Sequence, residues 1–68
     1  MEAYQNRVLL EAKELAKKIN SLQLFMVKET FHDVDSKEKI RMYRQLNVMS
    51  QYLNILNERI DSFLIGKN

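Results

Sequence analysis

Apolar residues recur along this chain at alternating intervals of three and four positions, first in its N-terminal half and again in its C-terminal half. This spacing keeps side chains on one stripe of an α-helix, because a helix turns once in about 3.6 residues. It predicts helices over about residues 2–28 and about residues 36–64. The predicted seam between them consists of Val8, Ala12, Leu15, Ile19, Leu22, Met26, Met42, Leu46, Met49, Leu53, Leu56, Ile60 and Phe63.

The connection between the predicted helices falls in about residues 29–35. Asp35 is a candidate N-cap for the second helix, and Glu38, three residues later, predicts a capping box. The chain has no Pro, and its single Gly is Gly66, so nothing interrupts either helix. A short loop between two long helices returns the chain antiparallel. The sequence therefore predicts an all-α fold, an antiparallel two-helix hairpin that forms one domain over residues 1–68.

Both predicted helices carry further residues, mostly apolar, on the helix surface beside the seam. These positions are Leu9 and Ala16 in the first helix, and Val48, Tyr52, Ile55 and Arg59 in the second. Two helices shield only the seam between them, and a 68-residue chain without Cys has no disulfide to supplement a small core. We therefore predict that the hairpin dimerises into a four-helix bundle or a higher homo-oligomer through these six residues. The alternative is that they are scattered surface residues, which are normal in proteins.

Charge and hydropathy restrict the classes of partner. The 11 basic and 9 acidic residues leave a net charge of only +2, so specific binding of nucleic acid is not expected. No apolar run approaches the roughly 18 to 20 residues that span a membrane, and polar residues interrupt any secretory signal near the N-terminus. The lack of Cys fits a reducing compartment. We expect a cytoplasmic protein with no membrane partner.

A basic cluster surrounds the predicted start of the second helix. It consists of Lys28, Lys37, Lys39, Arg41, Tyr43 and Arg44, with His32 nearby in the loop. Arg binds phosphate through two parallel hydrogen bonds and Tyr stacks on a base, so this mixture suits a nucleotide or an acidic protein surface. An exposed, solubilising helix face is the alternative explanation of the same residues.

Few side chains suit a metal ion or catalysis. His32, Asp33 and Asp35 lie close together in sequence, but their spacing matches no calcium loop, and turns and caps commonly use Asp for their own hydrogen bonds. We therefore predict helix capping, with no metal and no cofactor. An enzyme needs a nucleophile or an acid–base pair in a concave site, and a two-helix chain with one His and no Cys offers little for one. We expect no enzymatic activity.

Two motifs, each combining polar and apolar residues, lie in the two predicted helices. The first comprises Asn6, Arg7, Val8, Glu11, Glu14 and Leu15, and the second comprises Arg44, Gln45, Met49, Tyr52, Leu56, Glu58, Arg59, Ile60 and Phe63. Over about residues 4–63 the chain resembles a family of very short phage-encoded proteins related to one first named in crAss-like phages. That family opens with Gln-Arg-Val and an acidic stretch containing Leu, so Asn6 departs from its pattern.

This resemblance implies a non-catalytic phage anti-defence protein, which would act stoichiometrically as a homo-oligomer in the cytoplasm of the host bacterium. Its partner would be a host defence protein, as for an anti-CRISPR-type inhibitor of a host effector. One alternative is a sponge that encloses a cyclic nucleotide signal between protomers with Arg41, Tyr43 and Arg44. Another is a structural or regulatory coiled-coil-like adaptor. The resemblance also draws attention to Arg7, Tyr52 and Arg59, either as inter-helix ion pairs, the favoured role, or as ligand contacts.

Overall fold

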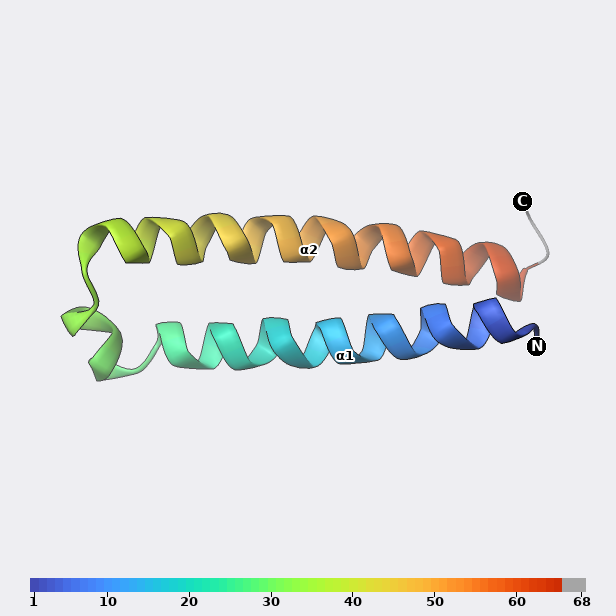
Figure 1. Cartoon of the computed structure of the whole chain (residues 1–68), viewed down its shortest axis with the longest axis horizontal. Helices are drawn as coiled ribbons and strands as arrows, with labels where there is room; N and C mark the ends of the chain where they lie inside the picture. The colour runs from blue at the N-terminus through green and yellow to red at the C-terminus, as the bar shows by residue number, and fades with distance from the viewer. Residues whose placement is uncertain (66–68) are drawn as a thin grey trace.

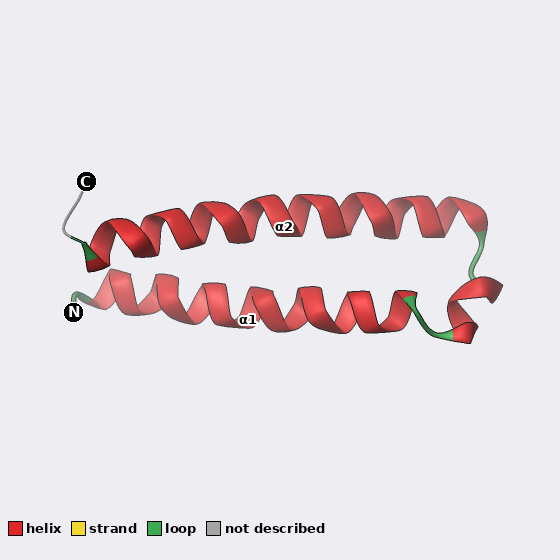
Figure 2. Ribbon diagram, turned by 180° about the vertical axis from the view of Figure 1, so that it is seen from behind, coloured by secondary structure: helices red, strands yellow, loops and turns green. Residues whose placement is uncertain are grey.

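Two long helices lie antiparallel and side by side in the computed structural model, which describes residues 1–65 (Figure 1). Helix α1 spans Ala3–Met26, the short 3-10 helix η1 spans Glu29–Asp33, and α2 spans Ser36–Leu64. Over the described residues the fold is all-helical, with no strand, as the hairpin prediction requires. Figure 2 shows that loops form only the short connections beside η1 and the chain ends. Residues 66–68, the last part of the predicted domain, lie outside the described residues.

Helix α1 starts and ends at local hydrogen bonds. At its start, the Glu2 backbone N–H donates to Gln5 Oε1 at 3.0 Å. At its end, the Lys28 N–H donates to the Phe25 carbonyl at 3.0 Å, and this bond to a residue three positions earlier tightens the last turn. The helix therefore ends at Met26, two residues before the predicted position.

Helix α2 begins at the predicted cap. The Lys37 N–H donates to Asp35 Oδ2 at 3.0 Å, which satisfies one of the free donors of the first turn. Glu38 is not used as predicted. Its Oε1 atom instead accepts from Arg41 Nε at 2.7 Å, because a charged guanidinium one turn ahead makes a stronger hydrogen bond than a neutral backbone amide.

The loop contains a small aromatic cluster that periodicity does not predict. Phe31, in η1, is buried, and its ring makes T-shaped contacts with Phe25 and Tyr43, both at a centroid distance of 6.0 Å. Lys39 Nζ lies 5.3 Å from the centroid of the same ring and donates to the His32 carbonyl at 3.1 Å. Edge-to-face pairs contribute about 0.5–1.5 kcal/mol beyond burial, so the cluster fixes the turn to both helices.

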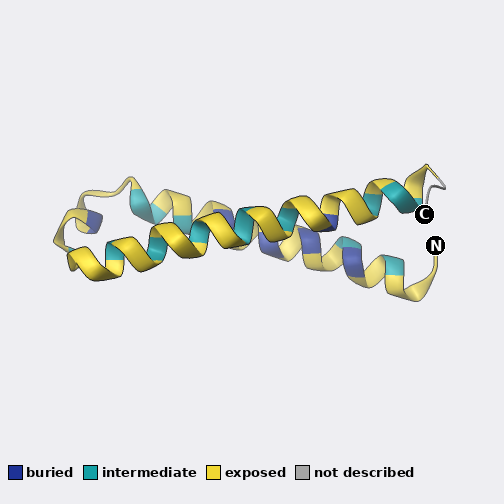
Figure 3. Ribbon diagram, turned by 90° about the horizontal axis from the view of Figure 1, so that it is seen from above, coloured by how far each residue is buried: buried dark blue, intermediate teal, exposed yellow. Residues whose placement is uncertain are grey.

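The hairpin core is a single seam between α1 and α2. Its buried members are Val8, Ala12, Leu15, Ile19 and Leu56, and Leu46, Met49, Leu53, Ile60 and Phe63 pack against them while partly buried. The remaining predicted seam residues, Leu22, Met26 and Met42, are half-buried. Of all described side chains only Leu56 is fully enclosed, with 0% exposure. Seen from above, most of the outer surface of α2 is exposed (Figure 3).

The hairpin is long and thin. It measures 47 × 15 × 15 Å, with a radius of gyration of 15.3 Å, whereas a compact chain of this length has about 11 Å. Its accessible surface is 5425 Å², whereas a compact monomer of its mass exposes about 4500 Å². An excess of about 900 Å² therefore stays in contact with solvent. Within the described part of the chain, neither helix has a stretch long and apolar enough to cross a bilayer.

Substitution of the enclosed residue tests the seam. We expect Leu56→Ala to lower the free energy of unfolding by about 2–5 kcal/mol, because it opens a cavity where the two helices touch. Leu24→Ala, which removes the same atoms from a side chain that is 54% exposed, should change it by under about 0.5 kcal/mol. Urea unfolding followed by far-ultraviolet circular dichroism measures both. Equal losses would contradict this description of the core.

Candidate functional site

One face of α2 carries a regular row of exposed residues, which we call the α2 stripe. Its members are Lys37, Arg41, Arg44, Val48, Tyr52, Ile55 and Arg59, at intervals of three or four residues. The apolar middle of the stripe is in water: Val48 is 64% exposed, Tyr52 42% and Ile55 55%. Basic residues stand at both ends. At about 1.5 Å per residue, Arg41 and Arg59 lie about 27 Å apart along the helix.

A hollow of about 380 Å³ lies toward the N-terminal end of the stripe. It is lined by Arg41, Arg44, Gln45, Val48 and Met49, all from α2. Met49, which is half-buried and packs against the hairpin core, and Val48 provide the apolar part of the lining. Arg41 and Arg44 provide the charged part, which we call the positive rim.

The rim is suited to an anion. A guanidinium has five N–H donors arranged in a planar fork, which matches the oxygens of a phosphate or carboxylate. In Arg41 the Nε donor is used by Glu38, and the terminal nitrogen atoms lie beyond that bond. The ion pair with Glu38 is exposed, with 61% and 50% of the two side chains accessible, so it is worth at most about 1 kcal/mol. An incoming phosphate therefore competes with a weak interaction.

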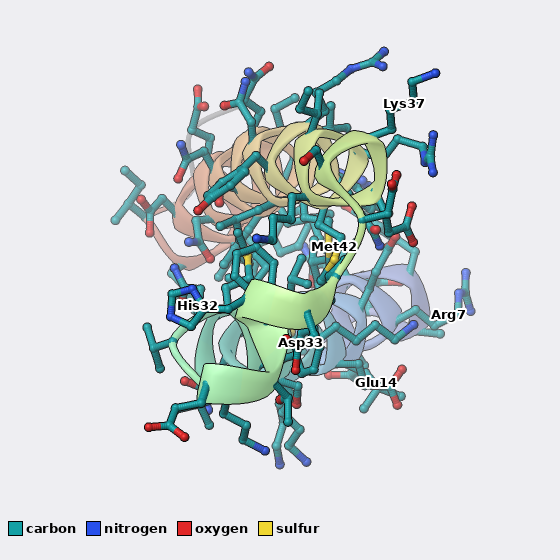
Figure 4. The ribbon with its side chains drawn as sticks, turned by 90° about the vertical axis from the view of Figure 1, so that its left-hand side faces the viewer. Arg7, Glu14, His32, Asp33, Lys37 and Met42 are labelled. Carbon is teal, nitrogen blue, oxygen red and sulfur yellow. The ribbon has the colours of Figure 1, made fainter. Side chains whose placement is uncertain are left out.

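The structure divides the predicted basic cluster between two sides of the hairpin. Arg41 and Arg44 line the hollow, and Lys37 belongs to the same stripe. Tyr43 and Lys39 instead contact Phe31 in the loop, and Lys28 lies exposed just before η1. Figure 4, viewed from the loop end, shows Lys37 and His32 on opposite sides. The predicted aromatic member Tyr43 therefore lies away from the hollow, and Gln45, Val48 and Met49, which the cluster did not include, take part in it.

The six predicted interface residues also lie on more than one surface. Arg7 and Glu14 project from α1 to the same side as Lys37, which begins the α2 stripe (Figure 4). Leu9 and Ala16 each follow one of these residues by two positions, or about 200° around the helix, so they lie on the other side of the hairpin. Only Val48, Tyr52, Ile55 and Arg59 share a face. Leu9 is half-buried beside the seam, and Ala16 is exposed.

The acidic and imidazole groups of the loop are not gathered around a common point. Asp35 caps α2, and His32 and Asp33 project from η1 in different directions (Figure 4). Over residues 1–65, no three His, Cys, Asp or Glu side chains are grouped as metal ligands. The hollow on α2 is therefore the site with the clearest binding chemistry.

Comparison with known proteins places the chain in a family. No curated protein and no solved structure matches it. The sequence model of the family described as Sequestin matches residues 2–62, a range that includes both helices and the loop between them. That range nearly coincides with residues 4–63, which carry the resemblance described above. Because the match covers most of its length, the chain belongs to the Sequestin family.

Proposed function

We propose that this chain is a non-catalytic sequestering protein, which binds a small anionic nucleotide stoichiometrically as a homo-oligomer. The observation that carries the proposal is the hollow on α2, whose lining combines Arg41 and Arg44 with the apolar side chains of Val48 and Met49. The name of the family, Sequestin, denotes sequestration and supports a role in holding a ligand. Of the three functions that the sequence predicts, this is the sponge.

The chemistry of the hollow favours a nucleotide. Guanidinium groups bind phosphate by charge-assisted hydrogen bonds, and the Val48 and Met49 side chains offer apolar surface to a base or sugar. The volume of about 380 Å³ lies within the roughly 300–1,000 Å³ of small-molecule sites. Such sites enclose most of their ligand, whereas the walls here come from a single helix. A second protein surface is needed to close the hollow.

The surface of the hairpin supports assembly with another copy. The excess exposure of about 900 Å² is close to the roughly 800 Å² that each partner buries in a standard interface. Burial of each large apolar side chain of the stripe is worth about 1.5–3 kcal/mol, which is substantial for so small a domain. A two-fold dimer is the commonest closed assembly.

The other two predicted functions need the same surface for a different purpose. An inhibitor of a host effector or an adaptor would place the α2 stripe against another protein, and the two arginines would contact acidic side chains. The sponge is favoured over both because the two arginines also line a hollow. The phage anti-defence setting stays a prediction from the resemblance.

The molecular mass in solution tests the homo-oligomer. Light scattering on purified protein over a range of micromolar concentrations should give at least about twice the 8.2 kDa of one chain, because the stripe is covered only in an assembly. Val48→Asp should shift the mass toward one chain, since burial of an unpaired carboxylate is costly. Leu24→Asp, at an exposed position off the stripe, should leave it unchanged. A folded wild-type monomer at every concentration would contradict the proposal.

Material that co-purifies with the protein tests the ligand class. With three Tyr and no Trp the chain absorbs weakly, so bound nucleotide is visible in its ultraviolet spectrum. Heating should release the nucleotide into a filtrate that mass spectrometry identifies. We expect Arg44→Ala to reduce the amount at least about tenfold, because a hydrogen bond to a charged group is worth about 1.5–3 kcal/mol. Lys17→Ala, on the exposed side of α1, is the control.

Different results would favour the other functions. Protein that carries no nucleotide but captures and blocks a host nuclease would favour the inhibitor. Protein that captures a virion or replication component and leaves defence intact would favour the adaptor. Either result would contradict the sponge.

A further inference from the structure

We infer that a second copy of this chain lies antiparallel along the α2 stripe and completes the hollow with its own Arg59. This inference rests on the proposed function and specifies the site: two anions per dimer, each held by Arg41 and Arg44 of one copy and by Arg59 of the other. Three features support this arrangement: the order of residues along the stripe, the shape of the hairpin and the distribution of charge over its face.

The α2 stripe can pair with the stripe of a second copy that runs in the opposite direction, if the two-fold axis lies at the level of residue 50. A two-fold axis there places Val48 opposite Tyr52 of the second copy, and Tyr52 opposite Val48, as an isologous interface requires. The same operation places Gln45 opposite Ile55 of the second copy and Arg41 opposite Arg59. Val48 and Tyr52 therefore pack against each other at the centre, Ile55 faces Gln45, and the basic ends of different copies meet.

Two hairpins that stack face to face through their stripes can be related by a two-fold axis in two ways. If the axis runs perpendicular to the helices, α2 of one copy lies antiparallel on α2 of the other. If the axis runs parallel to the helices, α2 of one copy lies on α1 of the other. Arg7 and Glu14 project from α1 on the same side as the stripe (Figure 4), so the second arrangement would press exposed Val48 and Tyr52 against charged side chains. Burial of charge against apolar side chains is costly. In the antiparallel α2 pair, Val48 and Tyr52 instead face each other, and charged side chains of the stripe meet only near its two ends.

The antiparallel pair gathers three guanidinium groups around each hollow. Arg59 reaches the level of Arg41 because both lie nine residues from the axis, and Arg44 lies less than one turn from Arg41. Glu38 offsets part of the charge of Arg41 through its 2.7 Å contact. The remaining like charges repel one another at close range unless an anion lies between them. The assembled site is therefore electrostatically incomplete without its ligand.

This arrangement also gives a role to two positions singled out by the family motif. Tyr52 covers Val48 of the second copy, and Arg59 closes the hollow. In the hairpin alone, Tyr52 is 42% exposed, and Arg59 is exposed at the end of the stripe. Both residues act across the interface between copies.

Single-cysteine variants determine the orientation, because the chain has no native Cys. In the antiparallel pair, Val48→Cys protein should form disulfide dimers on oxidation only when mixed with Tyr52→Cys protein, since a disulfide needs Cα atoms about 4.4–6.8 Å apart. Each variant alone should stay largely uncrosslinked, as should Lys17→Cys as a control. Efficient crosslinking of Val48→Cys with itself, or no crosslinking in the mixture, would overturn the antiparallel arrangement.

Charge reversal at Arg59 tests the shared site. Arg59→Glu should remove the repulsion across the interface and add two ion pairs per dimer, which tightens the ligand-free dimer about fivefold by analytical ultracentrifugation. The same variant, refolded from urea to remove native ligand, should lose binding of inorganic pyrophosphate in calorimetry. A residue with only a structural role in its own hairpin would not tighten the dimer. Weaker dimerisation of Arg59→Glu would overturn the inference.

Pyrophosphate titration of further variants separates this inference from the proposed function. We expect Arg44→Ala and Arg59→Ala each to weaken binding at least about tenfold, with Lys17→Ala unchanged. Loss of binding in Arg44→Ala with full binding in Arg59→Ala would overturn the contribution of the second copy and leave the proposed function standing. A wild-type protein that binds no pyrophosphate and releases no nucleotide would overturn both.

Discussion

Two packed helices bury only the side chains along the line where they touch, and the rest of the structure depends on this constraint. Over the described residues, the two helices of this chain fully enclose one side chain, Leu56, and leave most of the remaining seam partly accessible. A third long helix would cover the outer faces, but residues 1–65 form two long helices and the short η1. Large apolar side chains such as Val48, Ile55 and Leu64 therefore stay exposed, and the total accessible surface is large for the mass of the chain.

The side chains on the two sides of the hairpin have different roles. On the loop side, Phe31 contacts Phe25, Tyr43 and Lys39, so aromatic and basic residues there hold the turn in place. On the stripe side, Arg41 and Arg44 have no such structural task beyond an exposed pair with Glu38. This division explains why only Arg41 and Arg44 of the predicted basic cluster line the hollow on α2.

Sequestration makes modest demands on a fold. No reacting group has to be positioned, so a shallow hollow closed by another copy is sufficient, and the energy of assembly and the energy of ligand binding support each other. Membership of the Sequestin family agrees with such a role. In the proposed dimer, the two-fold symmetry would double every contact and supply the missing wall of each hollow, which is how a chain of 68 residues would hold a ligand.

The sequence by itself determined the helical hairpin, since the spacing of apolar residues and the Asp35 cap act within a few turns of one helix. It also predicted Arg41 and Arg44 as anion ligands in a nucleotide hypothesis, and the structure places both at the hollow on α2. Only the tertiary structure decided which neighbours share a face. Tyr43 and Lys39 contact Phe31, Glu38 pairs with Arg41, and Arg7 projects to the same side as Lys37 at the start of the α2 stripe. Leu9, two positions after Arg7, therefore lies on the other side of the hairpin. The reason is geometric. Periodicity fixes angles around one helix, whereas side-chain partners depend on the relative rotation of two helices and on the path of the loop between them.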